Sequence, residues 1–192
     1  MAFATQRIDT SEHMIPVHRD LFADRSQSSW GHCNAVVDLT PLHSSACTGL
    51  FINEIWIAPD CMFSQRAMDG NSHRHDAKHI SESGNMLFVS RFLSGQSTGC
   101  TGDSPYAIHP GSIAIRDYSR PFDGIQTAGV TQGVFFLHEG LGFDPTENPS
   151  LMVFPENSIV AKVLHAEFDA AFSQLSEGSG QISAERTSRI RS

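Results

Sequence analysis

The chain has 192 residues, 40% of them hydrophobic, which is enough for one buried core and slightly long for a single small barrel. Its net charge of −8 argues against direct binding of DNA phosphates, because such binding depends on clustered Lys and Arg. No stretch approaches the roughly 18 consecutive apolar residues of a membrane span, and the N-terminus lacks the apolar segment of a signal peptide, so we expect a cytoplasmic protein without membrane contact.

The chain begins with a polar segment. Residues 1–29 are predicted to form an N-terminal arm, with one short apolar patch near its end. From Trp30 the sequence becomes rich in Val, Ile, Phe and Trp. Strands are predicted over Asn34–Leu39, Leu50–Ile57 and Cys61–Met68. The polar stretch that follows, Asp69–Asn85, is typical of either a long loop or a ragged pair of strands.

The most pronounced strand pattern lies in the middle of the chain. Met86–Leu93 alternates between two faces that are both mainly apolar, as in a closed or double-layered sheet. Further strands are predicted around a tight turn at Pro110-Gly111 and over Val130–Leu137, where Gly133 suggests a bulge or a close approach. About seven to nine short strands separated by turns predict a barrel or sandwich over residues 30–150.

The last part of the chain, residues 151–192, has helical periodicity. Apolar residues recur at intervals of three and four from Asn157 to Leu175, which predicts an amphipathic helix capped by Asn157 or Ser158 and closed by Gly178. A second helix is predicted from Ser183, and a chain that stops inside it suggests truncation.

Three histidines form the main candidate metal site. The spacing His73-x-His75-x-x-x-His79 allows two imidazoles to share a strand face, and imidazole binds Zn, Fe or Ni. The turn at Pro110-Gly111, however, is not followed by the fourth ligand of a metal-binding cupin. No nucleophile motif, phosphate loop or paired carboxylates occur. We therefore expect no catalytic residue, cofactor or metal, and retain a metal-dependent cupin enzyme using these histidines as the alternative.

Arg91 is the main candidate for ligand binding. It lies on an otherwise apolar strand face, where a guanidinium needs partners. It would either receive a ligand carboxylate or pair with Asp117 or Glu54 in a purely structural role. The candidate pocket-lining aromatic residues are Phe88, Phe92, Tyr106, Phe135 and Phe136, all of which core packing also explains.

The central region resembles a known family. Its motifs are Phe88-x-x-Arg91-Phe92-Leu93-x-Gly95 and Tyr106-x-Ile108-x-Pro110-Gly111-Ser112-Ile113-x-Ile115-x-Asp117-Tyr118-Ser119-Arg120-Pro121-Phe122. They resemble the N-terminal, cupin-like sensor domain of AraC-type transcriptional regulators. Ser112 replaces the usual Asp after the glycine, whereas Arg66 fits the pattern. The resemblance covers roughly residues 18–192, and its matched positions are mainly structural: Pro110, Gly111, Asp117, Arg120 and Pro121.

The resemblance implies a mainly β fold, a cupin-like barrel or double-stranded β-helix followed by one or two helices. The barrel would bind a small-molecule effector, for which the candidates are Arg91, Phe88, Phe92, Tyr106 and Phe136. The helices would form a homodimer through Val160, Leu164, Phe168 and Phe172. DNA would be bound only through a helix-turn-helix domain that these residues do not include. An interaction module with a solidly filled barrel is a further alternative.

Overall fold

The computed structural model describes residues 4–9, 38–42, 51–57, 61–83, 86–138 and 147–179. Within them the protein is mainly β, and the expectation of a cupin-like β structure with a C-terminal helix is confirmed. Most of the predicted arm, the start of the strand predicted from Asn34 and the helix predicted from Ser183 lie outside the described residues.

The strands form two antiparallel sheets. The larger sheet has seven strands, in spatial order β1 (Ala4–Asp9), β3 (Phe51–Ile57), β4 (Cys61–Met68), β11 (Gly129–Leu137), β6 (Met86–Phe92), β9 (Ile113–Asp117) and β12 (Leu151–Phe154). The smaller sheet has five, in the order β2 (Asp38–Pro41), β5 (Asn71–His75), β10 (Phe122–Gln126), β7 (Ser97–Thr101) and β8 (Ser104–Ile108).

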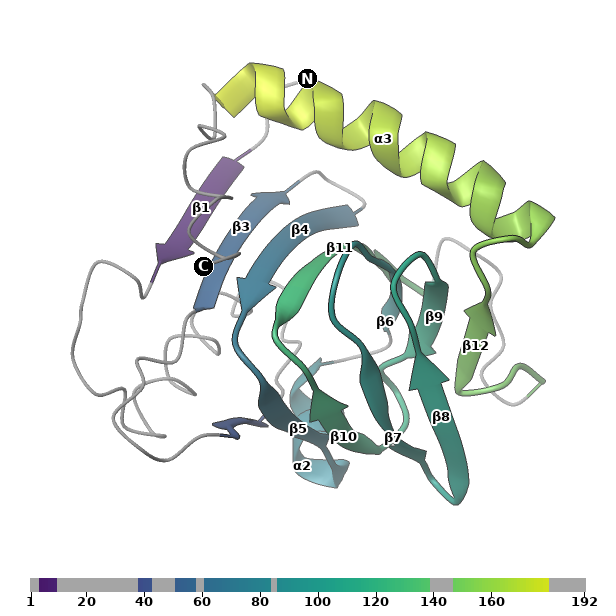
Figure 1. The fold of residues 1–192 in the computed structure, drawn as a ribbon. Helices are drawn as coiled ribbons and strands as arrows, with labels where there is room; N and C mark the ends of the chain where they lie inside the picture. The colour runs from purple at the N-terminus through teal and green to yellow at the C-terminus, as the bar shows by residue number, and fades with distance from the viewer. Residues whose placement is uncertain are drawn as a thin grey trace.

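Short connections join the two sheets. The chain passes between them from β4 to β5, from β6 to β7, from β8 to β9 and from β10 to β11. These crossings bring the two layers together in the barrel-like arrangement of Figure 1. One crossing is the predicted turn, where Gly111 has φ +78° and the amide of Ser112 donates to the carbonyl of His109 at 3.0 Å.

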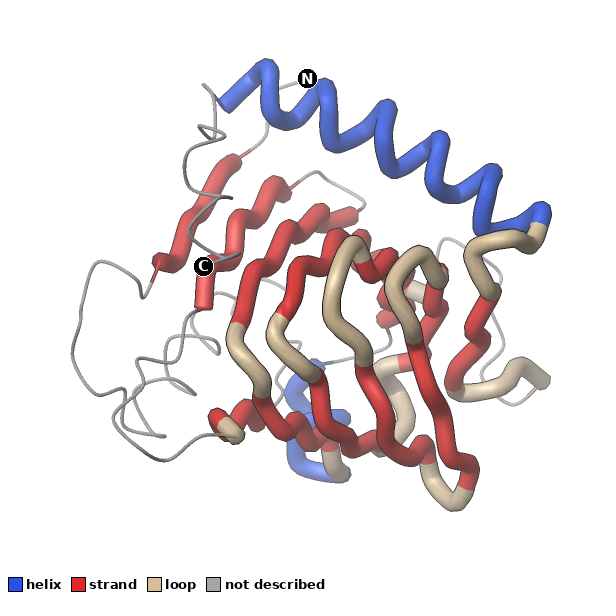
Figure 2. The backbone as a smooth tube through the Cα atoms, in the orientation of Figure 1, coloured by secondary structure: helices blue, strands red, loops and turns tan. Residues whose placement is uncertain are grey.

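A long C-terminal helix covers the outer face of the larger sheet (Figures 1 and 2). This helix, α3 (Ile159–Ser179), begins where the hydroxyl of Ser158 accepts a hydrogen bond from the amide of Ala161 at 3.1 Å. The predicted helix and its cap at Ser158 are confirmed, although the helix continues past Gly178. Its buried side chains, Phe168, Phe172 and Leu175 among them, pack against the sheet around Trp56.

Strand alternation divides the larger sheet into an inner and an outer face. On β6, Phe88 and Phe92 point to the space between the sheets, and Val89 packs with the cluster under α3. The same parity places Arg66 of β4 and Arg116 of β9 on the inner face. Each strand therefore contributes both to the helix-covered core and to the interior between the sheets.

The polar stretch Asp69–Asn85 is more ordered than a loop. It contains β5 and a short helix, α2 (Ala77–Ser83). The buried positions of β5 are polar, namely Asn71, His73 and His75, so its alternation does not have an apolar face that a sequence pattern would reveal. The strands β7, β10 and β12 were also missed, because they are short or contain glycine.

Two glycines lie where neighbouring strands pack closely. Gly133 forms no bulge, since it pairs in register with Ser64 on one side and Ser90 on the other. The ring of Phe88 occupies the space that a side chain would need there, so the predicted close approach requires the glycine. Gly99 lies within β7, with the carbonyl of Asp123 packed against it.

The end of β9 is held by a charged network. Asp117 is 1% exposed, accepts a hydrogen bond from the amide of Ser119 at 2.8 Å, and lies 3.4 Å from Nε of Arg120. Nε2 of His138 lies 3.4 Å from the same carboxylate. The Asp117…Arg120 sequence thus closes a turn between the sheets.

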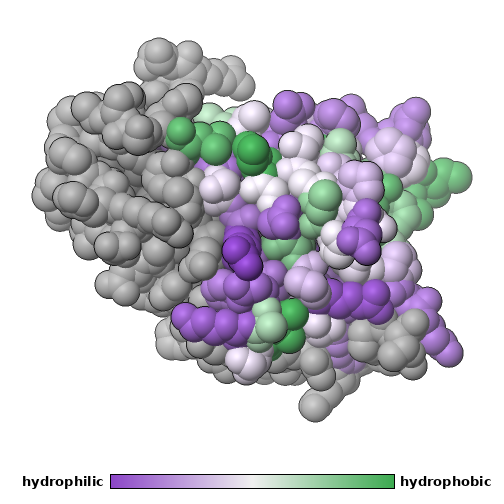
Figure 3. All heavy atoms as spheres, turned by 90° about the horizontal axis from the view of Figure 1, so that it is seen from below, coloured by the Kyte–Doolittle hydropathy of each residue, from purple (hydrophilic) through white to green (hydrophobic). Residues whose placement is uncertain are grey.

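The surface on the lower side of the molecule in Figure 1 contains both hydrophilic and apolar residues. Over its described part hydrophilic residues predominate, and apolar residues gather in small groups (Figure 3). Among the described helices, none is both long enough and apolar enough to cross a membrane.

Candidate functional site

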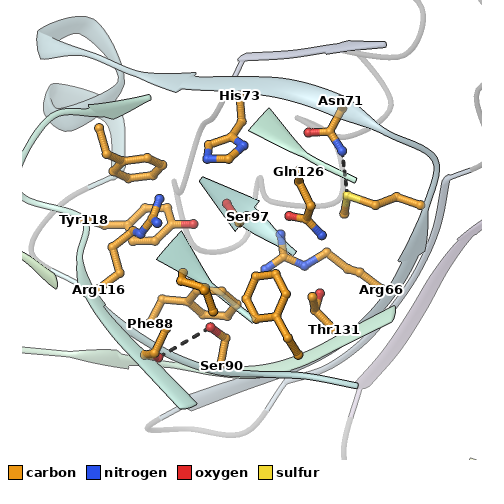
Figure 4. Close-up of a pocket in the computed structure, with 15 residues that line it drawn as sticks. Arg66, Asn71, His73, Phe88, Ser90, Ser97, Arg116, Tyr118, Gln126 and Thr131 are labelled. Atoms are coloured by element: carbon orange, nitrogen blue, oxygen red, sulfur yellow. Dashed lines mark hydrogen bonds between the residues drawn. The ribbon is translucent and has the colours of Figure 1, made fainter. Parts of the chain in front are cut away.

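The space between the two sheets contains a cavity (Figure 4). The centres of water molecules can occupy about 60 Å³ of it, several times the roughly 10–15 Å³ that one water molecule needs. The interior is therefore not filled solidly by side chains. The larger sheet contributes Arg66, Phe88, Ser90, Phe92, Arg116 and Thr131, and the smaller sheet contributes Asn71, His73, Ser97, Phe122 and Gln126.

Two arginines enter the cavity from opposite sides. Arg66 projects from β4 and Arg116 from β9, and both point toward the middle in Figure 4. These strands are separated by β11 and β6, which places them about 14 Å apart at the usual strand spacing. Long side chains from both strands can therefore meet across the cavity.

Arg116 is packed between aromatic rings. Its guanidinium carbon lies 4.7 Å from the ring centre of Tyr106 and 4.2 Å from that of Phe122. The side chain is buried, with a residue exposure of 8%. Aromatic faces attract a cation, but they leave its in-plane N–H groups without acceptors.

Arg66 lies against the aromatic wall. Its guanidinium carbon is 4.9 Å from the ring centre of Phe88. Burial, which outweighs the stabilising effect of the Tyr118 hydroxyl, lowers the pKa of Arg66 to about 10, and the positive charge of Arg116 acts in the same direction. Arg66 therefore remains charged at neutral pH. Burial also raises the pKa of Tyr118, whose hydroxyl stays protonated.

His73 is a neutral hydrogen-bonding group in the cavity wall. Burial, and then the charges of Arg116 and Arg66, lower its pKa to about 3. Its Nε2 lies 3.0 Å from the hydroxyl of Tyr106, which in turn donates to the carbonyl of Asp123 at 3.2 Å. Since that hydroxyl has a single hydrogen, we assign the proton of the imidazole to Nε2.

Further polar groups complete the wall. Asn71 is 1% exposed, and its amide nitrogen donates to Sδ of Met68 at 3.0 Å and to the carbonyl of Asp69 at 3.1 Å. Its Oδ1 and the amide nitrogen of Gln126 have no hydrogen-bond partner in the described part of the chain. Buried polar atoms normally have hydrogen-bond partners, so these two atoms could form hydrogen bonds with a ligand in the cavity.

The predicted binding residues separate into two groups. Phe88 and Phe92 line the cavity. Tyr106 lies behind Arg116 and faces an outer groove next to β12. Phe136 packs with the cluster beneath α3, and Phe135 stacks on Phe88 with ring centres 4.1 Å apart.

Arg91 lies outside the cavity. Its side chain leaves the outer face of β6, where its Nη1 pairs with Asp169 of α3 at 2.7 Å and its Nε donates to Gln132 at 2.7 Å. Its guanidinium also lies 5.3 Å from the ring centre of Phe168. The structural role considered for Arg91 is therefore observed, but with Asp169 as its partner in place of Asp117 or Glu54.

The three histidines point to different partners. His73 contacts Tyr106, whereas Nε2 of His75 lies 2.8 Å from the carbonyl oxygen of Tyr118. Nδ1 of His79 lies 2.9 Å from the carboxylate of Asp76. Among the described residues, no three His, Cys, Asp or Glu side chains are grouped so as to hold a metal ion.

The main charged residues of the cavity were not predicted from the sequence. Arg66 was noted only as part of the family resemblance, and Arg116 was not singled out. A usable signal was present in β9, where Ile113 and Ile115 share one face and Ala114 and Arg116 share the other. The burial pattern of β9 shows that both faces are enclosed, so Arg116 is a buried charge.

Comparison with known proteins identifies the fold. No family model matches the sequence, and no curated protein matches it. A solved structure of the AraC-like transcriptional activator CuxR does match, with a TM-score of 0.70 and 19% sequence identity, over 97% of this chain and 65% of that chain. The chain has the fold of the matched part of this activator. The resemblance to AraC-type sensor domains is thus confirmed at the level of the fold, over a part of the length of that activator.

The low pKa of His73 predicts a specific loss of stability in acid. Below pH 6.5 the unfolded chain binds a proton at this imidazole, and the folded protein does not until about pH 3. Stability therefore falls as the pH drops through this window, by up to about 1.4 kcal/mol per pH unit from this group. Urea unfolding between neutral pH and pH 4 should show a shallower decline for His73→Gln than for the unsubstituted protein.

A matched control is His109→Gln, in the exposed turn between β8 and β9. It should retain the slope of the unsubstituted protein. Equal slopes for His73→Gln and the unsubstituted protein would show that His73 titrates alike in both states, against the burial described above.

Proposed function

We propose that this chain is the effector-binding domain of an AraC-type transcription regulator, and that the cavity between the sheets is the effector site. The observation that carries the proposal is a cavity lined by buried polar and charged side chains within the fold of an AraC-like activator. Sites for small molecules commonly combine aromatic walls with a few convergent polar groups, and barrel interiors are a usual location.

The cavity lies at the inner face of the larger sheet, and α3 packs on the outer face of the same sheet. Regulation would follow from this arrangement. β6 contributes Phe88 and Phe92 to the cavity and Arg91 to the contact with Asp169 of α3. An effector that prefers one arrangement of β6 would therefore also favour one placement of the helix. DNA would be bound by a helix-turn-helix domain that these residues do not include.

The proposed homodimer would use α3. The stripe first expected to do so is partly taken up by the barrel, since Phe168 and Phe172 are buried against the sheet and Leu164 packs beside them. Apolar side chains remain exposed at the start of the helix: Ile159 at 81%, Val160 at 43% and Val163 at 57%. We assign dimer contact to this exposed group, because clustered apolar residues on a surface favour association.

Filling the cavity tests the effector site. Ser90 is buried in the cavity wall, so Ser90→Leu reduces the space inside, whereas Ser81→Leu changes an exposed position of α2. In a thermal-shift screen of small metabolites, at least one compound should stabilise the unsubstituted protein and Ser81→Leu but not Ser90→Leu. Hits that stabilise all three proteins equally, or a screen without hits, would contradict the proposed site.

Charge on the exposed start of α3 tests the dimer. Val163→Glu should convert a dimer into a monomer in light scattering after gel filtration at tens of micromolar, because it puts a carboxylate into an apolar contact. Ser173→Glu, at an exposed position further along the helix, should remain dimeric. A monomeric unsubstituted protein, or a dimer that tolerates Val163→Glu, would rule out this interface.

A further inference from the structure

The cavity has an excess of positive charge. Its lining residues include Arg66 and Arg116 and no Asp or Glu. This contrasts with the chain as a whole, which has 21 acidic and 13 basic residues. Acidic residues are therefore abundant, but none of the described ones lines this cavity.

The surroundings of Arg116 favour the binding of an anion. Its guanidinium carbon lies close to the rings of Tyr106 and Phe122, and in the described part of the chain it makes no hydrogen bond or ion pair. These rings offer no in-plane acceptor to its N–H groups. The N–H groups match the two oxygens of a carboxylate or phosphate.

The second guanidinium reinforces this requirement. Arg116 and Arg66 are close enough that the charge of one disfavours the charge of the other. Two buried like charges repel strongly in a medium of low dielectric constant. A single negative group between them relieves the repulsion and supplies acceptors for the N–H groups of Arg116.

Arg91 serves as an internal comparison. It lies on the same sheet and is buried to a similar degree, but on the outer face it has Asp169 and Gln132 as partners. There the fold supplies a carboxylate for a structural arginine. On the inner face none of the described residues that line the cavity supplies a carboxylate for Arg116, so we infer that its counter-ion is a ligand.

Size and lining restrict the ligand further. The cavity of about 60 Å³ admits a compact molecule in this conformation. Its remaining walls are mixed, and Phe88, Phe92 and Ile108 form part of their apolar surface. Neutral His73 adds no further positive charge, so one or two negative charges satisfy the site.

We propose that the cavity binds a compact organic anion whose charged oxygens lie between Arg116 and Arg66 and whose apolar body packs on the aromatic wall. This inference rests on the proposed function, since it names the chemical class of the effector. A carboxylate and a phosphate ester share the required chemistry, and the probes below distinguish them.

Calorimetric titration with matched acids and amides tests the proposal. The probes are benzoate with benzamide, butyrate with butyramide, and phenyl phosphate with inorganic phosphate. At least one organic anion should bind the unsubstituted protein at least tenfold more tightly than its uncharged or body-less partner. The stronger of benzoate and phenyl phosphate identifies the anion class.

Two substitutions locate the binding. Arg116→Met should weaken the anion at least tenfold and leave the amide unchanged. Arg74→Met should bind like the unsubstituted protein, because the side chain of Arg74 is 70% exposed on the outer face of β5. Amides that bind as tightly as acids, acids that bind Arg116→Met as tightly as the unsubstituted protein, or no binding by any probe would overturn the proposal.

The melting temperature without ligand gives a second readout. Arg116→Met removes a buried charge that has no counter-ion among the described residues, so it should melt at a temperature no lower than the unsubstituted protein. A large drop would mean that Arg116 is mainly structural and would count against the proposal. If Arg116→Met does not fold, Arg66→Met and Arg116→Lys are tested in the same titration. Each should weaken the binding of the anion at least tenfold.

The two proposals fail in different ways. Neutral compounds that bind the unsubstituted protein but not Ser90→Leu would preserve the effector site and overturn only its preference for anions. Compounds that bind equally with and without Ser90→Leu would overturn the effector site itself.

Discussion

The structure depends on how one sheet accommodates buried positive charge. A guanidinium removed from water needs hydrogen-bond acceptors and a counter-charge, and without them its burial costs several kcal/mol even after relaxation. The larger sheet buries Arg66, Arg91 and Arg116. Strand alternation sends Arg91 to the helix side, where Asp169 neutralises it, and directs the other two to the interior, where aromatic rings surround them.

The same alternation organises the rest of the fold. Outer-face residues of β4, β6, β9 and β11 form the core beneath α3 with Phe168 and Phe172. Inner-face residues of the same strands, with those of the smaller sheet, surround the cavity. Displacements of these strands would therefore act on both regions, which gives the proposed effector site a physical connection to the proposed dimer helix.

The sequence predicts the apolar elements well and the polar ones poorly. β4, β6 and α3 have strong periodic patterns and were placed within a few residues. The region of β5 was left open between a loop and a pair of strands, because its buried positions are Asn71, His73 and His75. These side chains interact with the cavity and the turn after β9 and not with an apolar core. β7 and β10 contain Gly99 and Gly124, where close packing between strands replaces side-chain pattern.

The prediction of the binding residues was limited for a different reason. A single strand shows that Phe88 and Arg91 lie on opposite faces, but not which face meets α3 and which meets the second sheet. Only the pairing of β4 and β9 into the same sheet reveals that Arg66 and Arg116 share the face of Phe88. The sequence thus identified the strand that lines the cavity with Phe88 and Phe92, but not the two arginines that point into the cavity.

The central claim is that an external anion binds Arg116 next to the charge of Arg66, whereas Arg91 is paired with Asp169 of the chain itself. Nitrogen-15 NMR of arginine side chains measures this directly, with the Nε–H signals of Arg66, Arg91 and Arg116 assigned by substituting each with Lys. On titration with the tightest-binding acid of the panel, the signals of Arg66 and Arg116 should shift together and saturate, with Arg91 unchanged. Shifts confined to Arg91, or identical shifts with the matching amide, would contradict the account.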